Sequence, residues 1–431
     1  MGIIIIISSF FNNVISLPFL FSYENRTSTT ALFYLVIISF ITLLCQFLIL
    51  LSIRKKQPLK IQFKRKYHFF TILMFSSVAF MIFLFTILVI DIYVNSSYDL
   101  LIYEFIIVYN LALALGIITV LTIKFGSWLK KKRNITVFLY TLAFSTFVLV
   151  IISVLFLIMQ ELDGKPLDVS PEPNPWDKTS TRILFFNDVY RLSLLISFIF
   201  IWIASAILLT SYSKNYIRRM GKAKFWFFVS LPLLYYLVSL DIITNSFHSL
   251  IFQYSYLSTV FIYLFGATKH IGGLFFALPF IYMAKNIENV HIKYYLILSS
   301  VGIMTLFSSV QVSILQILPY PPFGLTTITA MPIASFLLVI GLFYSAQSLS
   351  FDRQLLAELG RFIKNKPNSF LQNIGTIEWS NNVEGIVKQI KDKQSIQSIH
   401  DEHTHSALSK TDIRNYIYKV LEEVKGNRNE K

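Results

Sequence analysis

The residues of this sequence best suited to chemistry lie in one long apolar stretch, where Lys269 and His270 stand side by side. Gly266 precedes Lys269 by three residues, and Gly273 follows His270 by three. A helix would therefore carry all four on one face. Glycines permit close contact between helices, whereas an ammonium group and an imidazole require polar company inside a membrane. Two interpretations follow: a polar site with a specific role, or a purely structural buried ion pair.

Three carboxylates, Asp91, Glu104 and Asp241, lie three or four residues inside the expected outer ends of other apolar stretches. At a rise of 1.5 Å per residue this is a depth of about 5 Å, whereas Lys269 would lie about 15 Å below the outer boundary. The functional interpretation is an outward-facing polar vestibule, with the carboxylates at its rim and Lys269 and His270 at its floor. The alternative is simple hydration of the carboxylates near the lipid headgroups.

A polar stripe occurs in the apolar stretch that follows Lys293. Its members, at a spacing of zero, four, eight and eleven residues, are Thr305, Ser309, Ser313 and Gln316. On a helix this stripe must face protein or water. It predicts either hydrogen bonding between helices or part of a substrate path.

Near the carboxyl terminus, His400, His403 and His405 stand within six residues together with Asp401 and Glu402. Such a cluster could ligate zinc or nickel, and the alternative is a solvated loop or helix start. Because no second ligand cluster stands in the other expected cytoplasmic segments, we predict no metal site and no cofactor. The sequence has no Gly-rich phosphate loop, nucleophile elbow or His-Glu-x-x-His pair, so we expect the protein not to be an enzyme.

The elements that must position these residues are membrane helices. The chain has 431 residues, of which 55% are hydrophobic and only 14% charged, which exceeds the apolar content of soluble domains. Its apolar runs of about 20 residues match the length of a helix that crosses a hydrocarbon layer of ~30 Å. The net charge of +15 is carried by residues that flank these runs, so we predict contact with the lipid bilayer and no nucleic-acid partner.

The predicted fold is all-α, a polytopic transmembrane helix bundle of about nine spans in residues 31–347. The spans are Ala31–Ile53, Phe69–Val94, Leu101–Ile123, Ile135–Gln160, Leu192–Tyr212, Phe225–Thr244, Thr259–Met283, Tyr294–Ile317 and Leu325–Gln347. Residues 1–30 are predicted to form an apolar extracytoplasmic or re-entrant segment, although Met1–Tyr23 could also be an additional span or a cleaved leader. Residues 161–191 are predicted to form a Pro-rich external loop.

The distribution of basic residues predicts the orientation. Nineteen lysines and arginines lie in the alternate loops 54–66, 124–133, 214–224 and 285–293, against five in the N-terminal segment and the opposite loops. By the positive-inside rule the first set is cytoplasmic. We therefore expect a multi-pass protein of the cell membrane with its N-terminus outside and its C-terminus in the cytoplasm.

Residues 348–431 are predicted to form a short cytoplasmic helical tail. Apolar residues in Ser350–Ile363 recur at helical spacing, which indicates an amphipathic helix that lies on the inner leaflet or packs against a partner. A later helix is expected to begin at the capping box that starts with Ser409. A homo-oligomer or a partner protein could therefore assemble through this tail.

The run Tyr344–Asp352, which leads to Phe370–Glu378, resembles the membrane-proximal tail of uncharacterised multi-pass membrane proteins of ammonia-oxidising archaea. The resemblance implies an archaeal source and no particular activity. Three functions remain open. The first is a sensor or signal-transducing protein with a helical output tail; the second is a transporter or channel with a polar site around Lys269 and His270; the third is a structural subunit of a membrane complex.

Overall fold

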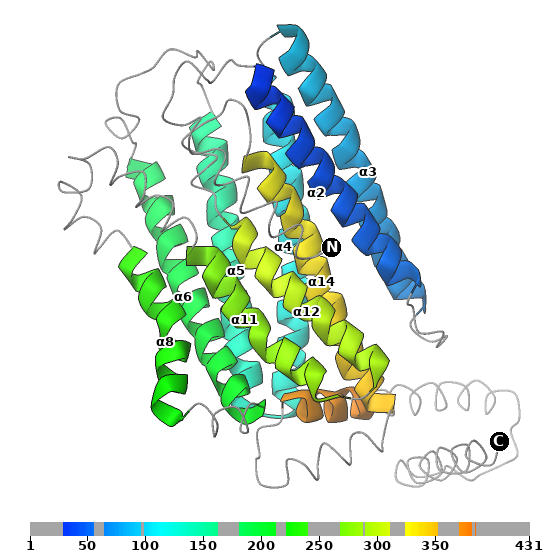
Figure 1. Ribbon diagram of the computed structural model, residues 1–431, viewed down its shortest axis with the longest axis vertical. Helices are drawn as coiled ribbons and strands as arrows, with labels where there is room; N and C mark the ends of the chain where they lie inside the picture. The colour runs from blue at the N-terminus through cyan, green and yellow to red at the C-terminus, as the bar shows by residue number, and fades with distance from the viewer. Residues whose placement is uncertain are drawn as a thin grey trace, which may run out of the picture. The chain divides into compact units, whose positions relative to one another are not determined.

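The computed structural model describes residues 29–55, 64–95, 99–162, 181–212, 221–239, 268–287, 289–310, 324–351, 370–381 and 384. Across this part of the chain the secondary structure is entirely helical (Figure 1). The chain divides into two compact units, Met1–Tyr344 and Ser345–Lys431. The predictions made for Met1–Tyr23, Asp241, Ser313, Gln316, most of Ser350–Ile363, the histidine cluster and the helix after Ser409 lie outside the described residues.

Each predicted span coincides with a helix over most of its length. The helices are α2 (Thr29–Lys55), α3 (Lys64–Asn95), α4 (Leu100–Lys131), α5 (Ile135–Leu162), α6 (Thr181–Tyr212), α8 (Lys222–Ser239), α11 (Thr268–Lys285), α12 (Val290–Ser309) and α14 (Gly324–Phe351). We call the end at which α4 and α11 finish, marked by Lys131 and Lys285, the basic end of the bundle, and the opposite end the distal end.

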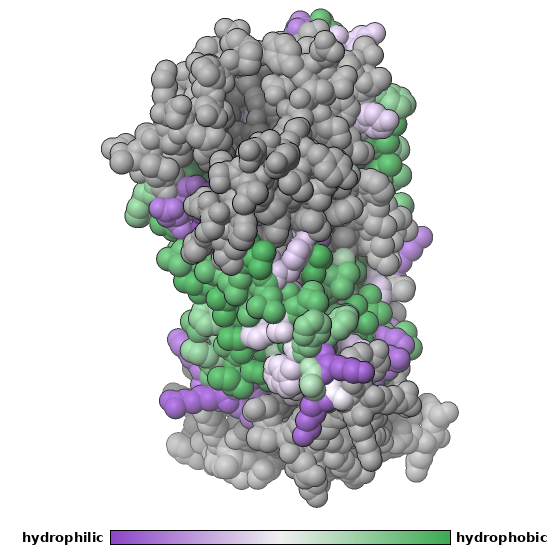
Figure 2. Space-filling view, turned by 60° about the vertical axis from the view of Figure 1, so that its left-hand side comes forward, coloured by the Kyte–Doolittle hydropathy of each residue, from purple (hydrophilic) through white to green (hydrophobic). Residues whose placement is uncertain are grey.

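Seven of these helices are long and apolar enough to cross a membrane; α8 and α11 are the two that fall short of that standard in the described residues. Figure 2 shows a band of hydrophobic side chains across the described part of one face, with hydrophilic side chains gathered below it. Many apolar side chains of the described helices are exposed, and Phe227 and Phe228 of α8 are more than half exposed. These features indicate a multi-pass membrane protein whose exposed apolar side chains face lipid.

In the first half of the bundle, helices that are consecutive in the sequence pack against each other, whereas in the second half helices also pack against partners that are distant in the sequence. Consecutive helices α4, α5 and α6 pack against one another, and α11 packs against α6, α8 and α12. Helix α14 joins residues from α2, α3, α4 and α12 in one hydrophobic core, which includes Leu50, Met74, Tyr295 and Leu337. Within its most apolar window 94% of the residues of α14 are buried, so α14 is an internal helix.

Some helix ends differ from the predictions. Helix α6 begins at Thr181 rather than Leu192, because the charged residues Asp188 and Arg191, before which the predicted span stopped, lie within the helix. Residues 181–191 of the predicted external loop are therefore helical, and residues 163–180 lie outside the described residues. Helix α12 ends at Ser309 rather than Ile317, and this end decides the environment of Lys269.

Two helices of the bundle contain a proline whose preceding turn accepts a hydrogen bond from a neighbouring helix. In α8, the carbonyl of Val229, three residues before Pro232, accepts from Trp202 Nε1 at 2.7 Å. In α14, the carbonyl of Thr329, three residues before Pro332, accepts from Gln46 Nε2 at 3.3 Å. Proline disrupts the hydrogen bonds of the turn before it, and no water replaces them in lipid, so these side chains supply hydrogen bonds where those of the helix are weakened.

Helices α12 and α14 approach each other through glycines. A Cβ atom on Gly302 would lie 2.6 Å from the backbone nitrogen of Leu338, and one on Gly341 would lie 2.5 Å from that of Ser299. Such distances leave no room for a side chain. Small residues at these positions therefore permit the backbone contact that holds the internal helix in place.

In the second unit, the described residues are Ser345–Phe351 at the end of α14, the helix formed by residues 370–381, and residue 384. Phe370, Leu371, Ile374 and Ile377 are buried, and a Cβ atom on Gly375 would meet the side chain of Leu349 at 2.8 Å. The second helix therefore packs against the end of α14. It forms a separate, short amphipathic element of the tail.

Candidate functional site

The candidate site is a polar node at the distal end of the bundle, made by Tyr190 of α6, Lys269 of α11 and the carbonyl of Val310, the residue that caps the end of α12. Lys269 Nζ donates to Tyr190 Oη at 3.1 Å and to the carbonyl of Val310 at 3.2 Å. Tyr190 Oη donates to the same carbonyl at 3.1 Å. Three segments that are far apart in the sequence are thereby joined at one carbonyl oxygen.

The position of the node follows from the lengths of its helices. Lys269 lies in the first turn of the described α11, and Val310 follows the last residue of α12. A helix of 20 residues such as α12 is about 30 Å long, the thickness of the hydrocarbon layer. The node therefore lies at the distal end of α12, about 30 Å along this helix from Val290 at the basic end.

The electrostatic environment of Lys269 is set by dipoles. The end of α12 carries a partial negative charge from its terminal carbonyls, which favours a cation there. The Tyr190 ring adds a cation–π contact, with its centroid 5.7 Å from Nζ. Within the described part of the chain no carboxylate forms an ion pair with Lys269, which is half-buried. The structural interpretation as a buried ion pair thus finds no acidic partner among these residues.

Close packing fixes the helix that carries Lys269. A Cβ atom on Gly273 would lie 2.9 Å from the carbonyl oxygen of Met304, so α11 meets the backbone of α12 there, as the spacing predicted. Gly272 lies against the ring of Phe198. His270, next to Lys269, is buried with 7% of its surface exposed. The glycines allow α11 to sit close enough to α12 for Lys269 to reach the end of that helix.

An aromatic layer closes the bundle on the basic side of the node. Phe198 of α6, Phe276 of α11 and Phe307 of α12 are at most 1% exposed, and their ring centroids lie 4.8 to 6.2 Å apart. Tyr236 of α8 stacks on Phe198 at 4.1 Å, and Phe147 of α5 lies 5.6 Å from Phe307. The layer separates the polar node from the interior of the bundle.

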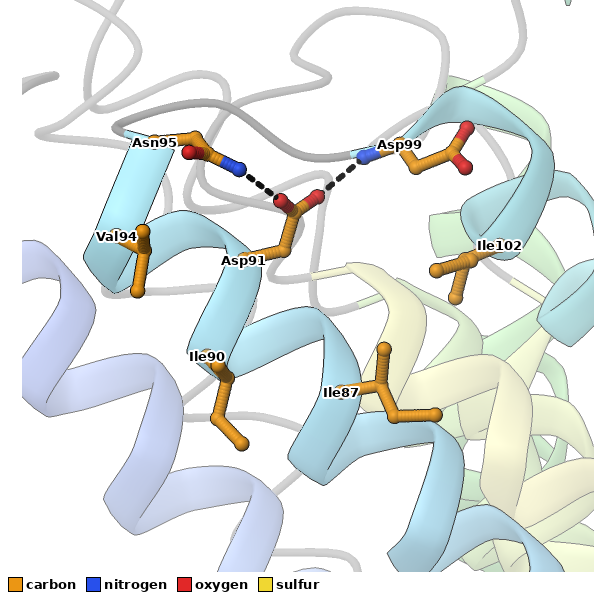
Figure 3. Close-up of a pocket in the computed structure, with 7 residues that line it drawn as sticks. All are labelled: Ile87, Ile90, Asp91, Val94, Asn95, Asp99 and Ile102. Atoms are coloured by element: carbon orange, nitrogen blue, oxygen red, sulfur yellow. Dashed lines mark hydrogen bonds between the residues drawn. The ribbon is translucent and has the colours of Figure 1, made fainter.

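Asp91 lies apart from the node, at the turn between α3 and α4, where it accepts two hydrogen bonds (Figure 3). The donors are Asn95 Nδ2 at 2.6 Å and the backbone N–H of Asp99 at 2.7 Å. Asp99 in turn caps the first turn of α4 by accepting from the N–H of Leu101. Asp91 therefore connects the end of α3 to the residue that caps the start of α4.

The same turn borders a pocket of about 430 Å³, lined by Asp91, Asn95 and Asp99 together with Ile87, Ile90, Val94 and Ile102. In Figure 3 the three polar side chains cluster around the turn, and the isoleucines line the side nearer the bundle. Glu104 is half-buried on α4. In the described residues no hydrogen bond or ion pair connects Asp91 or Glu104 with Lys269, so the carboxylate rim over a lysine floor is not assembled by these groups.

The polar stripe of α12 contains two unusual hydroxyl groups. Thr305 and Ser309 are 1% and 0% exposed, and neither hydroxyl has a hydrogen-bond partner among the described residues. Other serines of this helix donate to the preceding turn, for example Ser308 to the carbonyl of Met304 at 2.9 Å. Both hydroxyls stand at helical spacing from Gly302, which meets α14. The stripe is thus part of the protein interior.

Sequence reasoning did not identify Tyr190, Val310, Gln46 or Trp202 as functional groups. The signal for Gln46 and Trp202 would have been a proline in a neighbouring span, because such a helix requires an outside donor. Tyr190 and Val310 left no such signal. The sequence matches no protein-family model, no curated protein and no solved structure. Function must therefore be argued from the site itself.

Proposed function

We propose that this protein is a membrane sensor that passes a signal from the Lys269 node to its helical tail through α14. The supporting observation is the course of α14, which is internal to the bundle over Gly324–Tyr344 and continues without a break as Ser345–Phe351 of the second unit. A continuous helix shifts or rotates as one body. A displacement of its distal half is therefore carried into the tail.

The proposed topology has nine spans, with the N-terminus outside and the tail in the cytoplasm of the cell. Helices α6 and α12 both have an end at the basic side, at Tyr212 and Val290, so the chain between them must cross an even number of times. Because α8 and α11 pack within the same bundle, both crossing is the consistent solution. The basic loops then face the cytoplasm.

The alternative function as a transporter is less well supported, because the aromatic layer of Phe198, Phe276 and Phe307 stands between the node and the basic end. A transport path would have to open this layer. A receptor site requires only that the end of α12 and its neighbours change their arrangement when the node is occupied.

Hydrogen exchange tests the coupling. The full-length protein in phospholipid nanodiscs is compared with Tyr190→Phe, which removes one hydrogen bond of the node and keeps the ring. We expect amide exchange in residues 370–381 to change by at least ~5-fold, since allosteric couplings are of this order. Asp91→Asn is the control, because the bonds of Asp91 remain within the α3–α4 turn, and it should leave residues 370–381 unchanged.

Sensing is wrong if Tyr190→Phe alters exchange in α11 and α12 but never in residues 370–381. A flux assay addresses the competing function. Lys269-dependent solute uptake into proteoliposomes that persists after deletion of Ser350–Lys431 would establish a transporter. A structural subunit would instead co-purify with partner proteins in mild detergent.

A further inference from the structure

The hydrogen bonds within the node use the acceptors of Tyr190 and Val310 and two of the three N–H donors of Lys269. The carbonyl of Val310 already accepts from both Lys269 and Tyr190, which fills its two lone pairs. Tyr190 gives its own proton to that carbonyl, so its oxygen can act towards Lys269 only as an acceptor. An ammonium group has three N–H donors, and two are used here. Among the described residues, the node therefore leaves one N–H of a cation without an acceptor.

The charge of the node points to the nature of that acceptor. Lys269 has a full positive charge, while Tyr190, Val310 and the helix end supply only dipoles. A half-buried charge is costly near hydrocarbon unless it is neutralised. The acid closest to the node in sequence, Asp188, is exposed on α6 and forms no ion pair with Lys269 in the described residues. The described residues thus leave the site with a positive charge that a single negative charge would balance.

The surroundings define the remainder of the ligand. Along the same three helices toward the bundle interior follow the buried rings of Phe198, Phe276 and Phe307, which contact one another. A doubly charged phosphate would leave one negative charge against this apolar layer. A carboxylate or a phosphodiester carries one negative charge and can accept a hydrogen bond from the third N–H of Lys269. The remainder of such a ligand can be apolar.

We propose that Lys269 binds a singly charged oxyanion, either the carboxylate of a small solute or the phosphodiester of a lipid headgroup, at the distal end of the bundle. Lys269 donates its third N–H to the anion, and Tyr190 positions the ammonium by accepting from it. This inference names the ligand class of the site in the proposed function and depends on that proposal only for its role in signalling.

The test uses the full-length protein in maltoside micelles without phospholipid, titrated separately with acetate, benzoate and dihexanoyl phosphatidylglycerol. Benzamide serves as the neutral match of benzoate. We expect at least one of the anions to raise the unfolding midpoint of the wild type, and benzamide to have no effect. Acetate or benzoate acting alone identifies a solute site, whereas phosphatidylglycerol acting alone identifies a lipid site.

Variants then locate the binding. Lys269→Met should weaken binding by about 10- to 100-fold, the value of a hydrogen bond to a charged group. Lys285→Met, at the exposed other end of α11, should bind as the wild type does. The comparison of benzoate with benzamide in the wild type remains decisive if Lys269→Met does not fold.

The proposal is overturned if none of the three anions shifts the wild type, if benzamide acts like benzoate, or if Lys269→Met binds as tightly as Lys285→Met does. Binding that leaves residues 370–381 unaffected would overturn the proposed sensing and retain the site. The two failures are therefore distinguishable.

Discussion

At the scale of single residues, several polar side chains inside this protein donate hydrogen bonds to backbone carbonyls of neighbouring helices. Trp202 donates to Val229, Gln46 donates to Thr329, and Lys269 with Tyr190 donates to Val310. Each acceptor lies in the turn before a proline or at the end of a helix. Because lipid offers no donors, these carbonyls would otherwise be unsatisfied.

Replacing Trp202 by phenylalanine should destabilise the protein by about 1 kcal/mol, because the carbonyl of Val229 loses its side-chain donor beside Pro232. Trp226→Phe is a matched control, since Trp226 lies on α8, the helix that contains Pro232, and is 51% exposed. Equilibrium unfolding of the two variants in mixed micelles measures the difference. Equal free energies of unfolding for the two variants would show that the hydrogen bond of Trp202 makes no net contribution to stability.

The sequence identified Lys269 as a residue that needs polar partners, but it could not identify which groups these partners are. Hydropathy and helical spacing report on residues along one helix, whereas Tyr190 lies 79 positions away and the Val310 acceptor is a backbone atom common to all residues. The span that was predicted to run to Ile317 ends as a helix at Ser309, so the helix end beside Lys269 needed the structure. Asp91 was correctly placed near a helix end, but its bonds to Asn95 and Asp99 needed the structure.

At the scale of helices, the position of α14 depends on residues that lack side chains. Gly302 faces the backbone of α14 at Ala334 and Leu338, and Gly341 faces the backbone of α12 at Ser299. Two such contacts, one from each helix, allow the axes to approach closely over about half of α12. Backbone on both sides of the contact cannot move aside as a flexible side chain can.

Gly302→Ala should therefore destabilise the protein by about 1–3 kcal/mol, the usual cost of an added group in a tightly packed core. Gly116→Ala, in α4, is the control, because a Cβ atom there would meet nothing within 4 Å. Thermal unfolding in detergent, with cross-checks by size-exclusion chromatography, compares the two variants. Similar midpoints would contradict the close approach of α12 and α14.

The existence of the long helices could be predicted because apolar runs of membrane length have few alternative structures. Their ends could not, since the charged residues Asp188 and Arg191, before which the predicted span stopped, lie within α6. The helix at residues 370–381 was also missed as a separate element. Its signal was present in Phe370, Leu371, Ile374 and Ile377, whose spacing is helical, but a lone apolar stripe does not reveal its partner.

At the scale of the whole molecule, the proposed function depends on which side of the membrane holds the node. Every helix that contributes to the node reaches the basic end at its other terminus: α6 at Tyr212, α11 at Lys285 and α12 at Val290. If the basic loops are cytoplasmic, an anion reaches Lys269 from outside. If they are external, the site samples the cytoplasm, and an outward-facing sensor is excluded.

Cysteine labelling of intact cells decides this orientation and the number of spans together. The only native cysteine, Cys45, is buried and can be replaced by serine. In that background we expect a membrane-impermeant maleimide to label Asn95→Cys and Ser246→Cys but not Lys132→Cys, which should react only after the cells are permeabilised. Ser246 lies between α8 and α11 in the chain, so its labelling requires that both helices cross. Protection of Ser246→Cys together with Lys132→Cys would reduce the spans to seven, and labelling of Lys132→Cys in intact cells would invert the protein and place the anion site on the cytoplasmic side.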